Sequence, residues 1–242
     1  MEHLMKLWNS LKDNLGFVLV GIAVVAALAI LARLIEHFFP QKRKISPARR
    51  IALVAMCGAI AAILHMLDFP LPFLAPGFYK LDFSELPVLL ASFYLGPVAG
   101  IACEAVKIFL KLLIKGTSTA YVGDFANFVV GCALVLPASI CYHFRKTKKM
   151  AILGLCIGTV VLTAFGSLFN AVYLIPKFAQ LYGMPLETII AMGTDINPKI
   201  TSVTSLVLFA VVPLNLIKGT VVSFLTMILY KRIEKPIFDR FR

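Results

Sequence analysis

SVTSLVLFAVVPLNLIKGTVVSFLTMILY, residues 202–230, is an almost unbroken apolar run whose only charged residue is Lys218. A run of this length predicts a helix that crosses a bilayer, since about 20 apolar residues suffice. An ammonium near the bilayer centre costs roughly 2.5–3.5 kcal/mol on insertion scales, so we expect Lys218 to face the protein interior and to serve function. Asn215 lies three positions earlier and shares its helix face. Pro213 also deprives a carbonyl one turn earlier of its amide donor. The run therefore predicts a membrane helix with a polar notch.

The composition is typical of a membrane protein that crosses the bilayer several times. Of the 242 residues, 60% are hydrophobic and 15% charged, whereas soluble domains carry about 25% charged residues. The formal net charge of +12 comes mostly from short segments between apolar runs. No soluble basic segment interleaves with aromatics, which argues against a nucleic-acid partner. The five cysteines lie in or beside apolar runs without metal-ligand spacing. We therefore expect membrane lipid as the surroundings, and neither a metal nor a cofactor.

Seven apolar runs predict an all-α polytopic membrane protein. They are residues 15–39, 47–67, 83–95, 97–114, 121–144, 150–175 and 202–230. The first run stands apart and ends at a proline. We interpret residues 1–46 as an extra N-terminal transmembrane helix with a basic linker, and residues 47–242 as one membrane domain. The extra helix is an anchor, a partner surface or a membrane-insertion device.

Positive charge predicts the orientation of these spans. Three basic segments fall on one side of the alternating topology, namely 42–50, 145–149 and 231–242. The positive-inside rule assigns that side, with the C-terminus, to the cytoplasm. The opposite side then holds the N-terminus and the segments 69–82, 115–120 and 176–201.

Polar side chains gather in the outer half of three spans. In this orientation the outer parts of the spans carry Asp124, Asn127, Asn170, Tyr173 and, deeper, Asn215 with Lys218. The proline-rich and aromatic segment 69–82 is placed to close the outer mouth. Amide groups, one cation and apolar walls suit a planar amphipathic ligand with several donors and acceptors.

The span 97–114 contains a second polar set, Glu104, Lys107 and Lys111. Their spacing favours an interior ion pair between Glu104 and Lys107, with Lys111 reaching towards the outer interface. A share in the ligand site is the alternative.

Small residues recur four apart in the span 47–67. The two pairs are Ala55 with Ala59, and Gly58 with Ala62. Such spacing lets helices approach closely. It predicts either packing within the bundle or docking of a partner membrane protein.

Catalytic motifs are absent from the sequence. It has no nucleotide-binding GxxxxGK[ST], no HExxH and no GxSxG. An intramembrane enzyme would need two facing carboxylates, and Glu104 and Asp124 are expected at different depths. We therefore expect no enzyme. A proton-coupled carrier built on one acid and one lysine is a further alternative.

Three stretches resemble a known family of membrane proteins. FLAPGFYKLDFSELPVLLASFYLGPVAGIACEAVKIFLKLL, FNAVYLIP (169–176) and PLNLIKG (213–219) are similar to segments of riboflavin-specific S components. These are the substrate-binding subunits of energy-coupling factor (ECF) vitamin transporters. The resemblance spans about residues 47–235, so it leaves out the first apolar run.

The resemblance implies a six-helix core that binds riboflavin from outside, with the first outer loop as a lid. It also implies a prokaryotic cell membrane, a transmembrane coupling subunit that docks on Ala55 and Ala59, and two ATPase subunits. It implies flavin or lid contacts for Phe78, Tyr79, Leu81, Asp82, Asn170, Asn215 and Lys218.

The chemistry of a flavin fits these residues. Asn amides pair with a uracil-like edge, and Phe78, Tyr79 and Tyr173 suit the ring faces. A neutral ligand does not cancel the charge of Lys218, so we expect an acidic partner, water, or loss of that charge. Another vitamin or flavin (thiamine, biotin, folate or FMN) is the alternative ligand.

Overall fold

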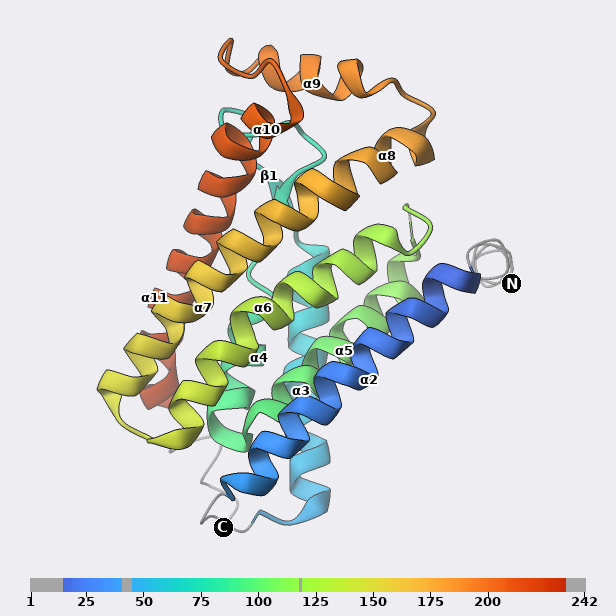
Figure 1. The fold of residues 1–242 in the computed structure, drawn as a ribbon. Coiled ribbons are helices and arrows are strands. Elements are labelled where there is room, and N and C mark those ends of the chain that lie inside the picture. The colour runs from blue at the N-terminus through green and yellow to red at the C-terminus, as the bar shows by residue number, and fades with distance from the viewer. Residues whose placement is uncertain (1–14, 41–44, 118, 234–242) are drawn as a thin grey trace.

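The computed structural model describes residues 15–40, 45–117 and 119–233, and in this part the chain is almost entirely helical (Figure 1). The predicted positions of the N-terminus and of most of the C-terminal basic segment lie outside the described residues. The elements are α2 (Leu15–Phe38), α3 (Pro47–Met66), β1 (Phe69–Pro70), β2 (Lys80–Leu81), α4 (Glu85–Leu95), α5 (Pro97–Lys115), α6 (Val122–Phe144), α7 (Lys148–Phe169), η1 (Asn170–Leu174), α8 (Ile175–Tyr182), α9 (Leu186–Thr194), α10 (Val203–Leu206), η2 (Val207–Val211) and α11 (Val212–Ile233).

Hydroxyl side chains start several of these helices. Ser46 accepts from the amide of Arg49 at the start of α3, where Pro47 occupies the first turn. Thr147 does the same for α7. Ser202 and Ser205 form a reciprocal capping box at α10. These residues satisfy amides that the first helical turn leaves free, which fixes where each helix begins.

Five described helical segments are long and apolar enough to cross a membrane: Gly21–Phe38, Pro47–Met66, Val122–Phe144, Lys148–Tyr182 and Val203–Ile233. α5 has the length of a span but carries charged side chains. Within the predicted apolar run 83–95 the structure forms the short helix α4. The 11 residues of α4 extend only about 16 Å, and a bilayer core is about 30 Å thick.

α4 is instead the centre of the bundle. Ten of its 11 residues are buried, which explains why it is apolar on every side. Phe93 and Tyr94 are among the largest fully buried side chains of the described residues. Around α4 the core draws on α3, α5, α6, α7 and α11. The six-helix core of the predicted fold is therefore confirmed, with one half-length helix inside it.

The two ends of the bundle match the predicted alternation. The end of α2, the start of α3, the α6–α7 junction and the end of α11 lie at one end (Figure 1). The β1–β2 loop, the α5–α6 turn and α8–α9 lie at the other. The strands pair antiparallel, Phe69 with Leu81 and Pro70 with Lys80. From this short hairpin the chain turns inward to α4.

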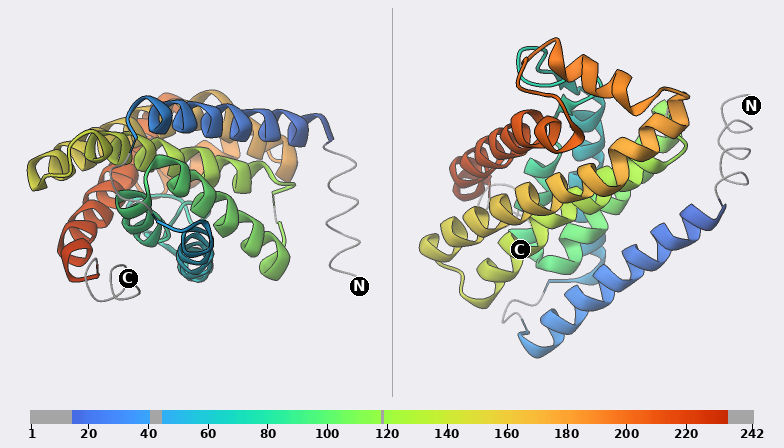
Figure 2. Two further views of the ribbon diagram at one scale, coloured as in Figure 1. Left: turned by 90° about the horizontal axis from the view of Figure 1, so that it is seen from below. Right: turned by 45° about the horizontal axis from the view of Figure 1, so that its top comes forward.

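α2 lies obliquely across α5 and α6 on the outside of the core (Figures 1 and 2). Its Ala32 is fully buried in a cluster with Ile101 and Phe128. Its outer side is apolar and exposed, as at Ile30. The boundary that we predicted between residues 46 and 47 falls between α2 and α3. The division into two units stays a prediction.

Candidate functional site

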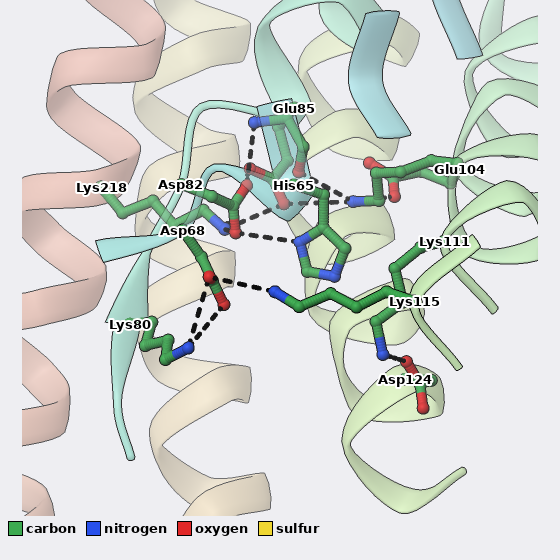
Figure 3. A network of polar contacts seen from close by, with 12 residues as sticks. His65, Asp68, Lys80, Asp82, Glu85, Glu104, Lys111, Lys115, Asp124 and Lys218 are labelled. Atoms are coloured by element: carbon green, nitrogen blue, oxygen red, sulfur yellow. Dashed lines mark hydrogen bonds and ion pairs between the residues drawn. The ribbon is translucent and has the colours of Figure 1, made fainter. Parts of the chain in front are cut away.

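Lys218 lies in a buried ion-pair network, next to the segment that links β2 to α4 (Figure 3). Its Nζ donates to Asp82 Oδ2 at 3.2 Å and to Glu85 Oε1 at 3.0 Å. Asp82 and Glu85 are 3% and 2% exposed. Of the three alternatives for Lys218 (an acidic partner, water or loss of its charge), the structure shows the first, with two acidic partners. The Asp82 carboxylate is buried against this ammonium, and its predicted lid contact stays a prediction.

Asp82 is fixed from three sides. Its Oδ1 accepts from the Ser84 amide at 2.8 Å, and His65 Nδ1 lies 3.3 Å from Oδ2. Burial alone would raise the pKa of the Asp82 carboxyl, but Lys218 and then His65 hold that pKa well below its usual range. The carboxylate therefore stays ionised and ties the inner end of the loop to α3 and α11.

The network continues through Glu85 to α5. Lys107 Nζ lies 3.4 Å from Glu85 Oε1, 3.2 Å from Ser84 Oγ and 2.5 Å from Glu104 Oε2. The side chains of Lys107 and Glu104 are 0% exposed. The predicted ion pair between Glu104 and Lys107 is confirmed. Through Glu85 this ion pair also joins the Lys218 cluster. An interior ion pair and a share in the ligand site, the two alternatives for Glu104 and Lys107, therefore do not exclude each other.

Two asparagine amides meet at Gly166 on α7. Asn170 Nδ2 donates to the Gly166 carbonyl at 2.8 Å. A β-carbon at Gly166 would lie 2.9 Å from Asn215 Nδ2 and 3.6 Å from Val130 on α6. The glycine therefore makes the space in which the Asn215 amide lies between α6, α7 and α11.

Both asparagine-bearing helices contain a π-helical turn that ends just before a proline. The amide of Ile175, which precedes Pro176, donates to Asn170. The amide of Val212, which precedes Pro213, donates to Val207. In each case the donor reaches back five residues instead of four. Such turns are often found at functional sites, because they re-aim the side chains around them.

Among the buried polar side-chain atoms of the described residues that have no hydrogen-bond partner, three belong to neutral amide or hydroxyl groups. They are Asn127 Oδ1, Ser167 Oγ and Asn215 Nδ2, on α6, α7 and α11. Unpaired buried groups of this kind cost about 1–3 kcal/mol each. A ligand that pairs with them would remove that cost. Asn127 and Asn215 are therefore suited to binding, as predicted, and their ligand contacts stay a prediction.

Tyr79 connects the loop between β1 and β2 to this site. Its hydroxyl donates to Asn170 Oδ1 at 3.1 Å, and its ring lies 4.5 Å from that of Phe78. Burial raises the pKa of the Tyr79 hydroxyl, so it remains a donor. The loop thus covers one of the asparagines, as the predicted lid requires.

Phe78, Leu81 and Tyr173 lie around the site in different ways. Phe78 lines an apolar cavity of about 230 Å³ together with residues of α8 and α9, such as Phe178. Leu81 is a buried residue of β2. Tyr173 stacks on Phe169 at 5.4 Å and packs against the N-terminal end of α6. Ligand contact remains a prediction for all three.

The small residues of α3 face two different environments. Gly58 and Ala62 are buried, and a β-carbon on Gly58 would lie 2.6 Å from Val106 of α5. Both pack within the bundle, which is one of the two predicted roles, and their docking role stays a prediction. Ala55 is exposed and Ala59 partly exposed. These two remain available for a partner.

Sequence reasoning missed Glu85 and His65. Glu85 begins the largely apolar run ELPVLLASFYL. A charged residue in an apolar run is the same signal that singled out Lys218, so it could have identified Glu85 as well. His65 gave no such signal, because histidines at span ends are commonly interfacial. We also expected Lys111 to reach the interface, but its Nζ lies 2.5 Å from Asp124 Oδ1. Asp124 is thereby engaged outside the Lys218 cluster. No group of metal-ligating side chains occurs among the described residues.

Comparisons with known proteins agree with this architecture. The family model described as "ECF transporter, substrate-specific component" matches residues 49–230. The riboflavin transporter RibU of Staphylococcus aureus (strain TCH60) is 34% identical over 193 residues, which are 80% of this chain and 94% of that protein. The riboflavin transporter FmnP of Bacillus subtilis (strain 168) is 30% identical over 195 residues, 80% and 96% of the two chains.

A solved structure has the same fold. It is described as "Structure and mechanism of the S component of a bacterial ECF transporter" and superposes with a TM-score of 0.62 at 36% sequence identity. The superposition covers 81% of this chain and 99% of the other. The family match begins after α2, so α2 lies outside what this family model describes.

Proposed function

Because this chain belongs to the family of ECF transporter substrate-specific components, we propose that it is the riboflavin-binding membrane subunit of such a transporter. The observation that carries the proposal is its similarity, over four fifths of its length, to proteins named as riboflavin transporters. The chain binds its ligand and catalyses no reaction of its own.

The donor and acceptor set suits the uracil-like edge of the flavin. An ammonium has three N–H donors, and Lys218 directs two of them to Asp82 and Glu85. One donor is left for a ring carbonyl or nitrogen. Asn215 adds an unpaired amide donor and Asn127 an unpaired acceptor. A ring that carries carbonyls and an imide offers a partner to each.

The charge balance of the cluster favours a neutral ligand. The network contains three carboxylates (Asp82, Glu85 and Glu104) and two lysines (Lys107 and Lys218), together with His65. Both ammonium groups already have carboxylate partners, so neither offers an unmatched positive charge. Riboflavin is therefore favoured over FMN, biotin and folate, which carry anionic groups. Thiamine, a cation, would compete with Lys218 for its carboxylates.

Transport requires other subunits. We propose that a transmembrane coupling subunit contacts the Ala55 and Ala59 face of α3, and that two ATPase subunits supply the energy. The protein lies in a prokaryotic cell membrane. The α2–α3 and α6–α7 junctions face the cytoplasm, and the β1–β2 loop and α9 face outward, so riboflavin enters from outside.

Riboflavin fluorescence tests the proposal. Purified protein should quench the fluorescence with nanomolar affinity, and Asn215→Ala and Lys218→Ala should each weaken binding at least tenfold. FMN, thiamine, biotin and folate should fail to displace bound riboflavin at equimolar concentration. No quenching at micromolar protein would show the ligand to be wrong. Uptake into liposomes by this chain alone would instead support a proton-coupled carrier.

A further inference from the structure

Glu85 receives two buried ammonium groups that approach from different helices. Lys218 of α11 lies 3.0 Å from its Oε1, and Lys107 of α5 lies 3.4 Å from the same oxygen. Two like charges this close repel unless a carboxylate lies between them. Glu85 therefore links the two lysines through one shared carboxylate oxygen.

The two lysines differ in access. The Lys218 side chain is 11% exposed and that of Lys107 is 0% exposed. Lys107 is enclosed by Glu104, Glu85 and Ser84. It has no path to a ligand, whereas Lys218 has one N–H to spare.

Lys107 has a second carboxylate partner, Glu104, besides Glu85. Glu104 lies one turn earlier on α5, and its Oε2 is 2.5 Å from Lys107 Nζ. Gly131 of α6 makes room for that carboxylate, since a β-carbon there would lie 2.8 Å from Glu104 Oε1. A full counter-charge thus anchors Lys107 independently of Glu85.

We propose that Lys107, anchored by Glu104, is a positioning residue for ligand recognition: it fixes Glu85, which aims the free N–H of Lys218 at one acceptor atom of the ligand. The inference rests on the proposed function and extends it to residues that do not touch the ligand. A merely structural Lys107 would affect folding and binding independently of Lys218.

A double-mutant cycle separates these two roles. The riboflavin dissociation constant is measured by fluorescence quenching for wild type, Lys107→Met, Lys218→Met and the double variant. We expect Lys107→Met to weaken binding about tenfold or more in the wild-type background and less than twofold in the Lys218→Met background, because coupled residues are not additive. An equal loss in both backgrounds would overturn the proposal.

Lys111→Met is the matched control on the same helix. Lys111 pairs with Asp124 and donates to the Gly116 carbonyl at 2.9 Å, outside the Lys218 cluster. Its loss should lower the melting temperature and leave riboflavin affinity within twofold. If Lys111→Met weakens binding as much as Lys107→Met, the effect is a general disturbance of α5, and the proposal fails.

Glu104→Gln in the Lys107→Met background tests whether binding depends on the net charge of the cluster or on the position of Glu85. The double change removes one acid and one base, so the charge of the cluster returns to its original value. Binding should stay weak, since Glu85 still lacks the ammonium that fixes it. Recovery of wild-type affinity would show that only the charge balance matters and would overturn the positioning role.

The melting temperatures of the ligand-free variants test the shared carboxylate without riboflavin. Losses from Lys107→Met and Lys218→Met should be non-additive, because the remaining lysine keeps Glu85 paired. If wild type binds no riboflavin, the proposed function is wrong, and this cycle alone decides whether the lysines share Glu85. Additive losses would overturn that arrangement.

Discussion

At the scale of single residues, the site depends on a missing side chain as much as on those present. Gly166 leaves the space that the Asn215 amide fills, and its carbonyl accepts from Asn170. One residue thus orients amides from two helices. Close packing makes such positions sensitive, because a well-packed interior cannot absorb even one added methyl group without movement.

Gly166→Ala should weaken riboflavin binding about tenfold or more, because the new methyl group would lie 2.9 Å from Asn215 Nδ2 and turn that amide away. Fluorescence quenching gives the affinity. In an Asn215→Ala background the same change should cost little further affinity, since the clash is gone. An equal loss in both backgrounds would contradict this account.

At the scale of elements, α2 is joined to the core by polar contacts at its C-terminal end. Glu36 Oε1 accepts from the amide of Val98 at 2.9 Å, and Arg50 Nη2 lies 3.1 Å from Glu36 Oε2. His143 Nε2 lies 2.6 Å from the Phe39 carbonyl. α5 begins at Gly96-Pro97 without a side-chain cap of its own. α2 therefore supplies the acceptor that the first turn of α5 lacks.

Glu36→Ala should lower the thermal stability, because it removes an acceptor for the first turn of α5 and a partner for Arg50. Losing a cap of this kind costs about 1 kcal/mol. The melting temperature of the detergent-solubilised protein should fall, while riboflavin affinity stays unchanged. Arg33→Ala, at an exposed position of the same helix, is the control and should leave the melting temperature as it is. An unchanged melting temperature for Glu36→Ala would show that α2 is held by its apolar contacts alone.

At the scale of the whole molecule, the outer faces of the bundle differ in what covers them. α2 lies over α5 and α6 (Figure 2). α3 has an uncovered face among the described residues, where Ala55 is exposed beside Met56 and Ile60. α2 does not cover the face of α3 that carries Ala55. A partner helix can therefore dock on this small-residue face.

Ala55→Leu should abolish co-purification with the coupling subunit and leave riboflavin binding intact, since the larger side chain keeps helices apart on a surface remote from Lys218. Val160→Leu, on an exposed position of α7, is the control and should assemble normally. Retained assembly of Ala55→Leu would place the docking surface elsewhere.

The sequence alone determined the number and order of the core helices, the all-α class and the polar notch on the last span. These properties are local, because the length and apolarity of a run decide whether it can cross a bilayer. The position of α4 at the centre of the bundle was not predictable in this way. An apolar run bounded by a turn looks the same whether it spans the membrane or lies at the centre of a bundle.

Only the tertiary structure decided the environment of Lys218. The sequence left open an acid, water or loss of charge, and Asp82, its partner, lies 136 residues away. It likewise could not tell that Gly58 faces α5 while Ala55 faces outward. Helical periodicity says which residues share a face, but what that face meets depends on contacts between distant segments. The charges that neutralise a buried lysine are therefore a property of the packed bundle.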